Sequence, residues 1–72
     1  MSIYVWVPSQ KYFYGDIQVF QSEQAVRVYL EHSTPNRVKG VGIGWSWGRS
    51  PLEAQVLIGN RPIGMLYSRE IL

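Results

Sequence analysis

The chain contains no cysteine among its 72 residues. Disulfide bonds and thiolate metal sites are therefore excluded, and stability has to come from packing, from self-association or from a partner. Histidine and aspartate occur once each, as His32 and Asp16. A single histidine cannot supply the usual ligands of a zinc site, and the four glutamates show no paired spacing that would indicate acid–base catalysis. We therefore expect no metal, no cofactor and no enzymatic activity.

Long apolar runs and long charged runs are missing as well. No apolar stretch approaches the about 18 residues of a membrane-spanning helix, and the N-terminus lacks the basic and apolar regions of a signal peptide. We expect a cytoplasmic protein that forms a single domain over residues 1–72 and makes no contact with a membrane. The net charge is +2, and the basic residues are scattered singly, which is a weak footprint for nucleic-acid binding.

The glycine-rich stretch GVGIGWSWG, residues 40–48, does not have the spacing of a phosphate-binding loop. After Gly40 and Gly42 the third glycine comes one position too early for a dinucleotide fingerprint, and no Gly-Lys-Ser/Thr follows as a P-loop requires. Strict alternation instead predicts a strand that begins near Val38. One face of this strand carries large side chains: Val41, Ile43, Trp45 and Trp47. The other face is nearly bare: Gly40, Gly42, Gly44, Ser46 and Gly48.

Two explanations fit the bare face, because glycine in a strand usually marks the close approach of another group. Aromatic rings of the protein itself could lie over the missing side chains. Alternatively, a partner backbone, a nucleic-acid base or a small ligand lies there, beside Trp45 or Trp47. The sequence leaves both explanations open.

Aromatic residues are abundant, with three Trp, five Tyr and two Phe. A domain this small buries only about 60% of the surface that its unfolded chain exposes, so some of these rings are expected at the surface. Exposed Trp and Tyr are typical of interfaces.

The first third of the chain predicts three strands. Residues 3–7 are β-branched or aromatic throughout, and Pro8 ends the run because it cannot donate to a ladder. Two further strand-like runs, residues 11–14 and 17–20, flank Gly15-Asp16, which predicts a hairpin with a two-residue turn.

A helix is predicted over residues 23–32, with Ser22 as its N-terminal cap. One side of this segment is apolar at helical spacing: Ala25, Val26, Tyr29 and Leu30. Glu23 and Arg27 are an i,i+4 pair in the favourable order. Residues 34–36, Thr-Pro-Asn, close the helix with turn chemistry.

Residues 51–58 fit two structures. Ser50 and Glu53 form a capping-box pattern around Pro51, whereas Ala54, Val56 and Ile58 alternate as in a strand. We favour one helical turn at residues 51–53, followed by a hairpin that turns at Gly59-Asn60. The expected fold is α+β: a small antiparallel sheet of four to six strands with one short helix packed on one face.

The expected function is that of a small non-catalytic protein-binding module. Trp45, Trp47 and Arg49 combine the three residue types that dominate interface hot spots. By analogy of size and fold, the chain resembles phage or mobile-element proteins that inhibit a host defence protein. The alternatives are a single-stranded nucleic-acid-binding domain and a nucleotide-binding sponge formed at an oligomer interface, and a homo-oligomer fits each of these functions. The candidate binding residues are Trp45, Trp47, Arg49, Gly42, Gly44, Tyr12, Tyr14 and Lys39.

Overall fold

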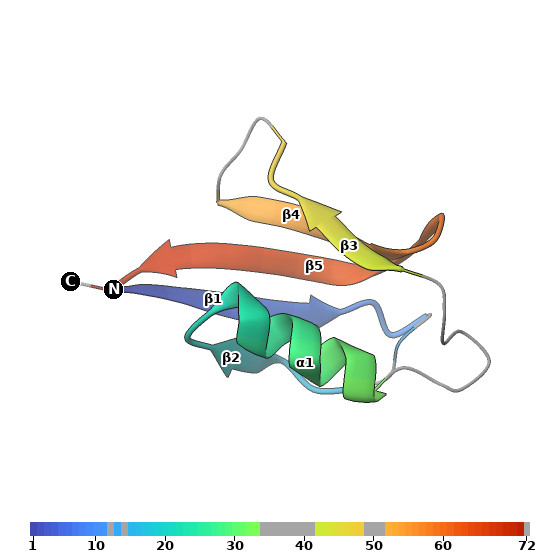
Figure 1. Ribbon diagram of the computed structural model, residues 1–72, viewed down its shortest axis with the longest axis horizontal. Coiled ribbons are helices and arrows are strands. Elements are labelled where there is room, and N and C mark those ends of the chain that lie inside the picture. The colour runs from blue at the N-terminus through green and yellow to red at the C-terminus, as the bar shows by residue number, and fades with distance from the viewer. Residues whose placement is uncertain (12, 14, 34–41, 49–51, 72) are drawn as a thin grey trace.

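The computed structural model describes residues 1–11, 13, 15–33, 42–48 and 52–71. These residues form one five-stranded antiparallel sheet and one helix (Figure 1). The elements in chain order are β1 (Ser2–Pro8), β2 (Gln18–Phe20), α1 (Glu23–Ser33), β3 (Ile43–Ser46), β4 (Glu53–Ile58) and β5 (Arg61–Glu70). Across the sheet the strands lie in the order β2-β1-β5-β4-β3. The expected α+β class, with one helix on a small antiparallel sheet, is confirmed.

The first and last strands of the chain form the centre of the sheet. β1 pairs with β5 along its whole length, from Ser2 opposite Glu70 to Pro8 opposite Gly64. The predicted strand at residues 3–7 is therefore confirmed, and Pro8 is its last residue. This pairing brings the two chain ends side by side at one end of the molecule (Figure 1).

The hairpin predicted around Gly15-Asp16 is wrong, although the strand predicted at residues 17–20 is present as β2 (Gln18–Phe20). Lys11 lies in a turn, Phe13 belongs to no strand, and β2 pairs with β1. The Phe13 amide donates to the Ser9 carbonyl at 3.1 Å, and the Phe13 ring meets Trp6 edge-on with their centroids 5.5 Å apart. Burial of Phe13 against a residue of β1 prevails over the local turn preference of the Gly-Asp pair.

The predicted helix is confirmed, because α1 spans Glu23–Ser33. The Ala25 amide donates to the Ser22 hydroxyl at 3.1 Å, which is the expected N-terminal cap. Val26 and Leu30 are fully buried against the sheet. The closing turn predicted at residues 34–36 lies outside the described residues.

The helical turn favoured for residues 51–53 is corrected by the structure at Glu53, which is the first residue of β4. Burial alternates along β4, with Ala54, Val56 and Ile58 buried, so the strand spacing was the correct signal. The predicted turn between β4 and β5 is confirmed, and Gly59 has the positive φ, 60°, that such turns favour.

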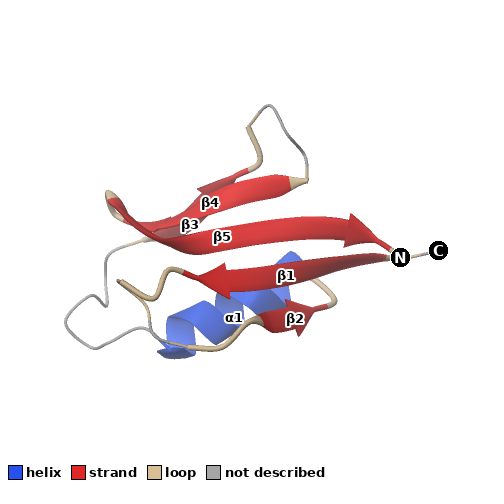
Figure 2. Cartoon of the chain, turned by 180° about the vertical axis from the view of Figure 1, so that it is seen from behind, coloured by secondary structure: helices blue, strands red, loops and turns tan. Residues whose placement is uncertain are grey.

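Apart from the irregularity at Val56 and Leu57, the register assigns the strand side chains to one of two faces. The face toward α1 holds the core, in which Trp6 lies opposite Leu66 and Val56 lies opposite Gly64. The side chains that alternate with these point away from α1. Figure 2 views the sheet from this second side, and no described element covers it there.

Candidate functional site

Trp45 and Trp47 project from β3 and its C-terminal end toward the helix side of the sheet. The indole N–H of each donates to the same atom, Oε1 of Glu23, at 2.8 Å for Trp45 and 3.0 Å for Trp47. One carboxylate at the start of α1 therefore holds both tryptophans. Both rings are half-buried and pack against the core.

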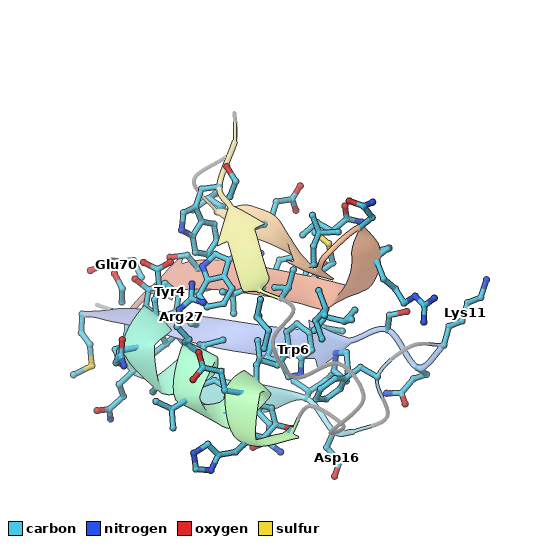
Figure 3. The ribbon with its side chains drawn as sticks, turned by 45° about the vertical axis from the view of Figure 1, so that its right-hand side comes forward. Tyr4, Trp6, Lys11, Asp16, Arg27 and Glu70 are labelled. Atoms are coloured by element: carbon cyan, nitrogen blue, oxygen red, sulfur yellow. The ribbon has the colours of Figure 1, made fainter. Side chains whose placement is uncertain are left out.

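Arg27, one turn further along α1, reaches the same strand. Its guanidinium carbon lies 4.7 Å from the centre of the Trp45 ring, and its Nη1 donates to the Ile43 carbonyl at 2.8 Å. Figure 3 shows Arg27 and Tyr4 between α1 and β3. Glu23 and Arg27, expected as a pair on the helix surface, thus both contact β3 or its tryptophans. We call Tyr4, Glu23, Arg27, Trp45 and Trp47 the tryptophan cluster.

The tryptophan cluster fastens the helix to the edge of the sheet. The Gly42 carbonyl accepts from the Gly59 amide of the β4–β5 turn at 3.3 Å, so the Ile43 carbonyl points to the free edge of β3, where Arg27 covers it. Tyr4 lies against Trp47 with a centroid distance of 6.1 Å. Both indole donors and one face of Trp45 are therefore already used within the chain.

Among the described residues, no atom lies within 4 Å of a Cβ built at Gly42 or Gly44. None of the described aromatic rings therefore covers these two glycines, and Tyr12 and Tyr14 lie outside the described residues. Gly42 directly precedes β3, whereas Gly44 and Trp45 are neighbours within it and face opposite sides of the sheet.

The closely approached glycine is Gly64 on β5, which was not among the candidates. A Cβ there would lie 2.5 Å from Cη2 of Trp6 and 2.6 Å from the Val7 carbonyl oxygen. Because Gly64 has no side chain, the ring of Trp6, the largest side chain of the core, can pack directly against β5. An isolated glycine within the strand-like run RPIGMLYS was the available signal.

The side of the sheet away from α1 carries a group of apolar side chains that we call the open face: Ile3, Val5, Val7, Leu57, Met65 and Tyr67. Val5 pairs with Tyr67 and Val7 pairs with Met65, so these four form the centre. Each of the six keeps an intermediate exposure. Val19 of β2, 60% exposed, extends the group toward that edge.

Polar side chains border the open face toward β4 and β3. Glu53 lies opposite Tyr67 and Gln55 lies opposite Met65, and both are exposed. Arg69 follows Tyr67 on the same side of β5, and its guanidinium carbon lies 5.4 Å from the Tyr67 ring centre. An apolar centre with a polar border is the usual anatomy of a protein interface.

Four candidate residues, Tyr12, Tyr14, Lys39 and Arg49, lie outside the described residues. Within the described ranges, no group of three or more His, Asp or Glu side chains could hold a metal ion. The same part of the chain has no helix with the length and apolarity that crossing a membrane would require.

Comparison of the chain with protein-family models, with curated proteins and with solved structures finds no match.

Proposed function

We propose that this chain is a small non-catalytic protein-binding module and that the open face is its binding surface. The observation that carries the proposal is the one-sided cover of the sheet: α1 packs on one face, and the other presents Val5, Val7, Met65 and Tyr67 in one group. Monomeric proteins rarely leave a contiguous apolar patch of this kind without an interaction that uses it.

The chemistry of the surface favours a protein over a nucleic acid. The open face is bordered by residues of both charges, Glu53 and Arg69, and the whole chain has a net charge of only +2. Single-strand binding needs a positive groove and free stacking surfaces, whereas Arg27 already covers one face of Trp45. A protein partner with an apolar contact surface could bind the open face without a positive groove or free stacking surfaces.

A narrower form of the proposal is an inhibitor of a host defence protein, encoded by a phage or mobile element. It rests on the size and fold of the chain by analogy. In that form the open face would bind and block the host protein.

The absence of cysteine makes a site-specific cross-linking test direct. A photoreactive group is attached to Val5→Cys on the open face, or to Gln24→Cys on α1 beside the tryptophan cluster, and each protein is illuminated in concentrated solution and in cell lysate. We expect protein adducts, to itself or to another protein, from position 5 and none from position 24. Adducts from position 24 alone would move the binding surface to the tryptophan cluster, and adducts from neither position would contradict protein binding.

A further inference from the structure

We propose that the partner of the open face is a second copy of this chain, packed sheet against sheet. The inference rests on the proposed function and names the partner of the same surface. Two sheets that pack face to face interdigitate the side chains of their inner faces, with their strands within about 30° of one another. The open face, apolar at its centre, could form one half of such a sandwich.

The two central strands make the open face complementary to itself. β1 presents the short side chains of Val5 and Val7, and β5 presents the long side chains of Tyr67 and Met65 directly beside them. A two-fold axis that runs along the strands between β1 and β5 places each β1 over the β5 of the other copy. Val5 then faces Tyr67 of the second copy and Val7 faces its Met65. Short side chains opposite long ones are the arrangement that lets two layers interdigitate.

The size of the open face indicates a weak association. The four strands that bear it, β1, β2, β4 and β5, have 7, 3, 6 and 10 residues. At about 3.3 Å per residue and about 4.8 Å between strands, they give a projected area of roughly 400 Å² per copy. Two copies together cover roughly 800 Å², which is at the low end for protein interfaces and about half of the about 1,600 Å² of standard ones.

The position of the core points in the same direction. A chain of this size without disulfides gains from a second packed layer, because its own core occupies only one side of the sheet.

Sedimentation velocity of the whole chain over about 1 µM to 1 mM tests the inference, because a weak association populates the dimer only toward the upper end of such a range. We expect a concentration-dependent shift from monomer to dimer. Val5→Lys places a charge at the centre of the interface. Met65→Lys also places a charge there, and its side chain is similar in length to that of methionine. Each should raise the dissociation constant at least about tenfold. Val28→Lys, on the exposed side of α1 with Val28 44% exposed, should leave it unchanged.

The near-ultraviolet signal of the three tryptophans reports folding of each variant independently of dimerisation, because all three lie on the helix side of the sheet. A dimer lost in both folded open-face variants and kept in Val28→Lys supports the inference. A folded wild-type chain that stays monomeric up to about 1 mM overturns the inference, because a dimer that forms only above this concentration is too weak to serve a function. A dimer that both Val5→Lys and Met65→Lys retain also overturns the inference.

Failure of the inference remains distinguishable from failure of the proposed function. A monomeric wild type whose position 5 nevertheless cross-links to another protein excludes the second copy and keeps protein binding. A monomeric wild type with no adduct at position 5 excludes the second copy and excludes the open face as the binding surface. Cross-linking between a Val7→Cys chain and a Met65→Cys chain, mixed and treated with a short bismaleimide, tests the two-fold axis itself. Random pairing at equal concentrations already gives about twice as much mixed adduct as either homodimeric adduct. We therefore expect the mixed adduct to exceed this twofold ratio, and a ratio of two or less would overturn this geometry.

Discussion

Gly64 shows how one missing side chain determines the packing of the core. A methyl group at this position would lie 2.5 Å from the Trp6 ring and 2.6 Å from the Val7 carbonyl oxygen. The fully buried ring and the backbone of the central strand can give little, so we expect Gly64→Ala to destabilise the fold by about 2–3 kcal/mol. The midpoint of urea unfolding, followed by tryptophan fluorescence, measures this loss.

Gly44→Ala is the matched control, because no atom of the described residues lies within 4 Å of its missing Cβ. Replacing a strand glycine by alanine in open space should be neutral or stabilise by up to about 1 kcal/mol. Equal effects of the two substitutions would contradict the close packing of Trp6 on Gly64.

Glu23 is the second residue whose role depends on long-range contacts. Its Oε1 atom accepts both indole N–H groups of the tryptophan cluster. We expect Glu23→Ala to destabilise the fold by about 1–2 kcal/mol, because two bonds to a charged acceptor are lost at a partly solvated site. Tryptophan emission of the native state should also change, since the surroundings of both rings change.

Glu31→Ala removes the same kind of side chain from the exposed end of the same helix. It should leave the native emission spectrum unchanged and alter the free energy of unfolding by less than about 0.5 kcal/mol. A shift in emission as large as that of Glu23→Ala would show that the carboxylate does not act on the tryptophans locally.

The N-terminal cap of α1 can be tested by substitution of Ser22. α1 has only 11 residues, and the Ser22 hydroxyl accepts from the Ala25 amide in its first turn. We expect Ser22→Ala to cost about 1 kcal/mol and Ser22→Gly only a few tenths, because glycine leaves the amides open to water. Thermal unfolding followed by circular dichroism at 222 nm compares the two, and a greater loss with glycine than with alanine would contradict the cap.

Elements defined by nearby residues could be predicted from the sequence, and those defined by distant contacts could not. The cap at Ser22, the apolar side of α1 and the Gly59-Asn60 turn are local signals, and each has the expected structure. The hairpin at Gly15-Asp16 failed because Phe13 is buried by Trp6, a residue of another element. Residues 51–58 carry two conflicting local signals, and the strand alternation at Ala54 and Val56 prevails over the capping pattern before it because both side chains are buried in the core.

The candidate site shows the same division at the scale of the whole molecule. Alternation correctly separated Trp45 from Gly44, but it could not tell which side α1 would cover. That choice depends on contacts between Trp45 and Glu23, 22 positions apart in the chain. The open face depends on the pairing of the first strand with the last, which brings Val5 beside Tyr67. Neither strand alone indicates a surface, since each has apolar side chains on both sides.

The pairing of β1 with β5 also joins the two ends of the chain, and this junction makes stability depend on pH. The Glu70 carboxylate binds the Met1 ammonium group at 2.8 Å and accepts from the Ser2 hydroxyl. The hydrogen bond to the N-terminus, then that to Ser2, holds the pKa of Glu70 below its ordinary value of 4.5. A carboxyl group whose pKa is lower in the folded state stabilises the fold above the ordinary value, and this contribution is lost as the pH falls through the folded pKa.

We therefore expect Glu70→Gln to reduce stability near pH 7 and to have progressively less effect below the ordinary pKa of 4.5, where the wild-type carboxyl becomes protonated as well. The difference should be small and should shrink with added salt, because the pair is solvent-exposed. Urea midpoints of the two proteins between about pH 3 and pH 7 measure it. Ser2→Ala keeps the ion pair but loses the hydroxyl bond, so its midpoints should lie between those of the other two proteins. Parallel curves for wild type and Glu70→Gln over this whole range would mean that the joined ends do not contribute to the acid dependence of the fold.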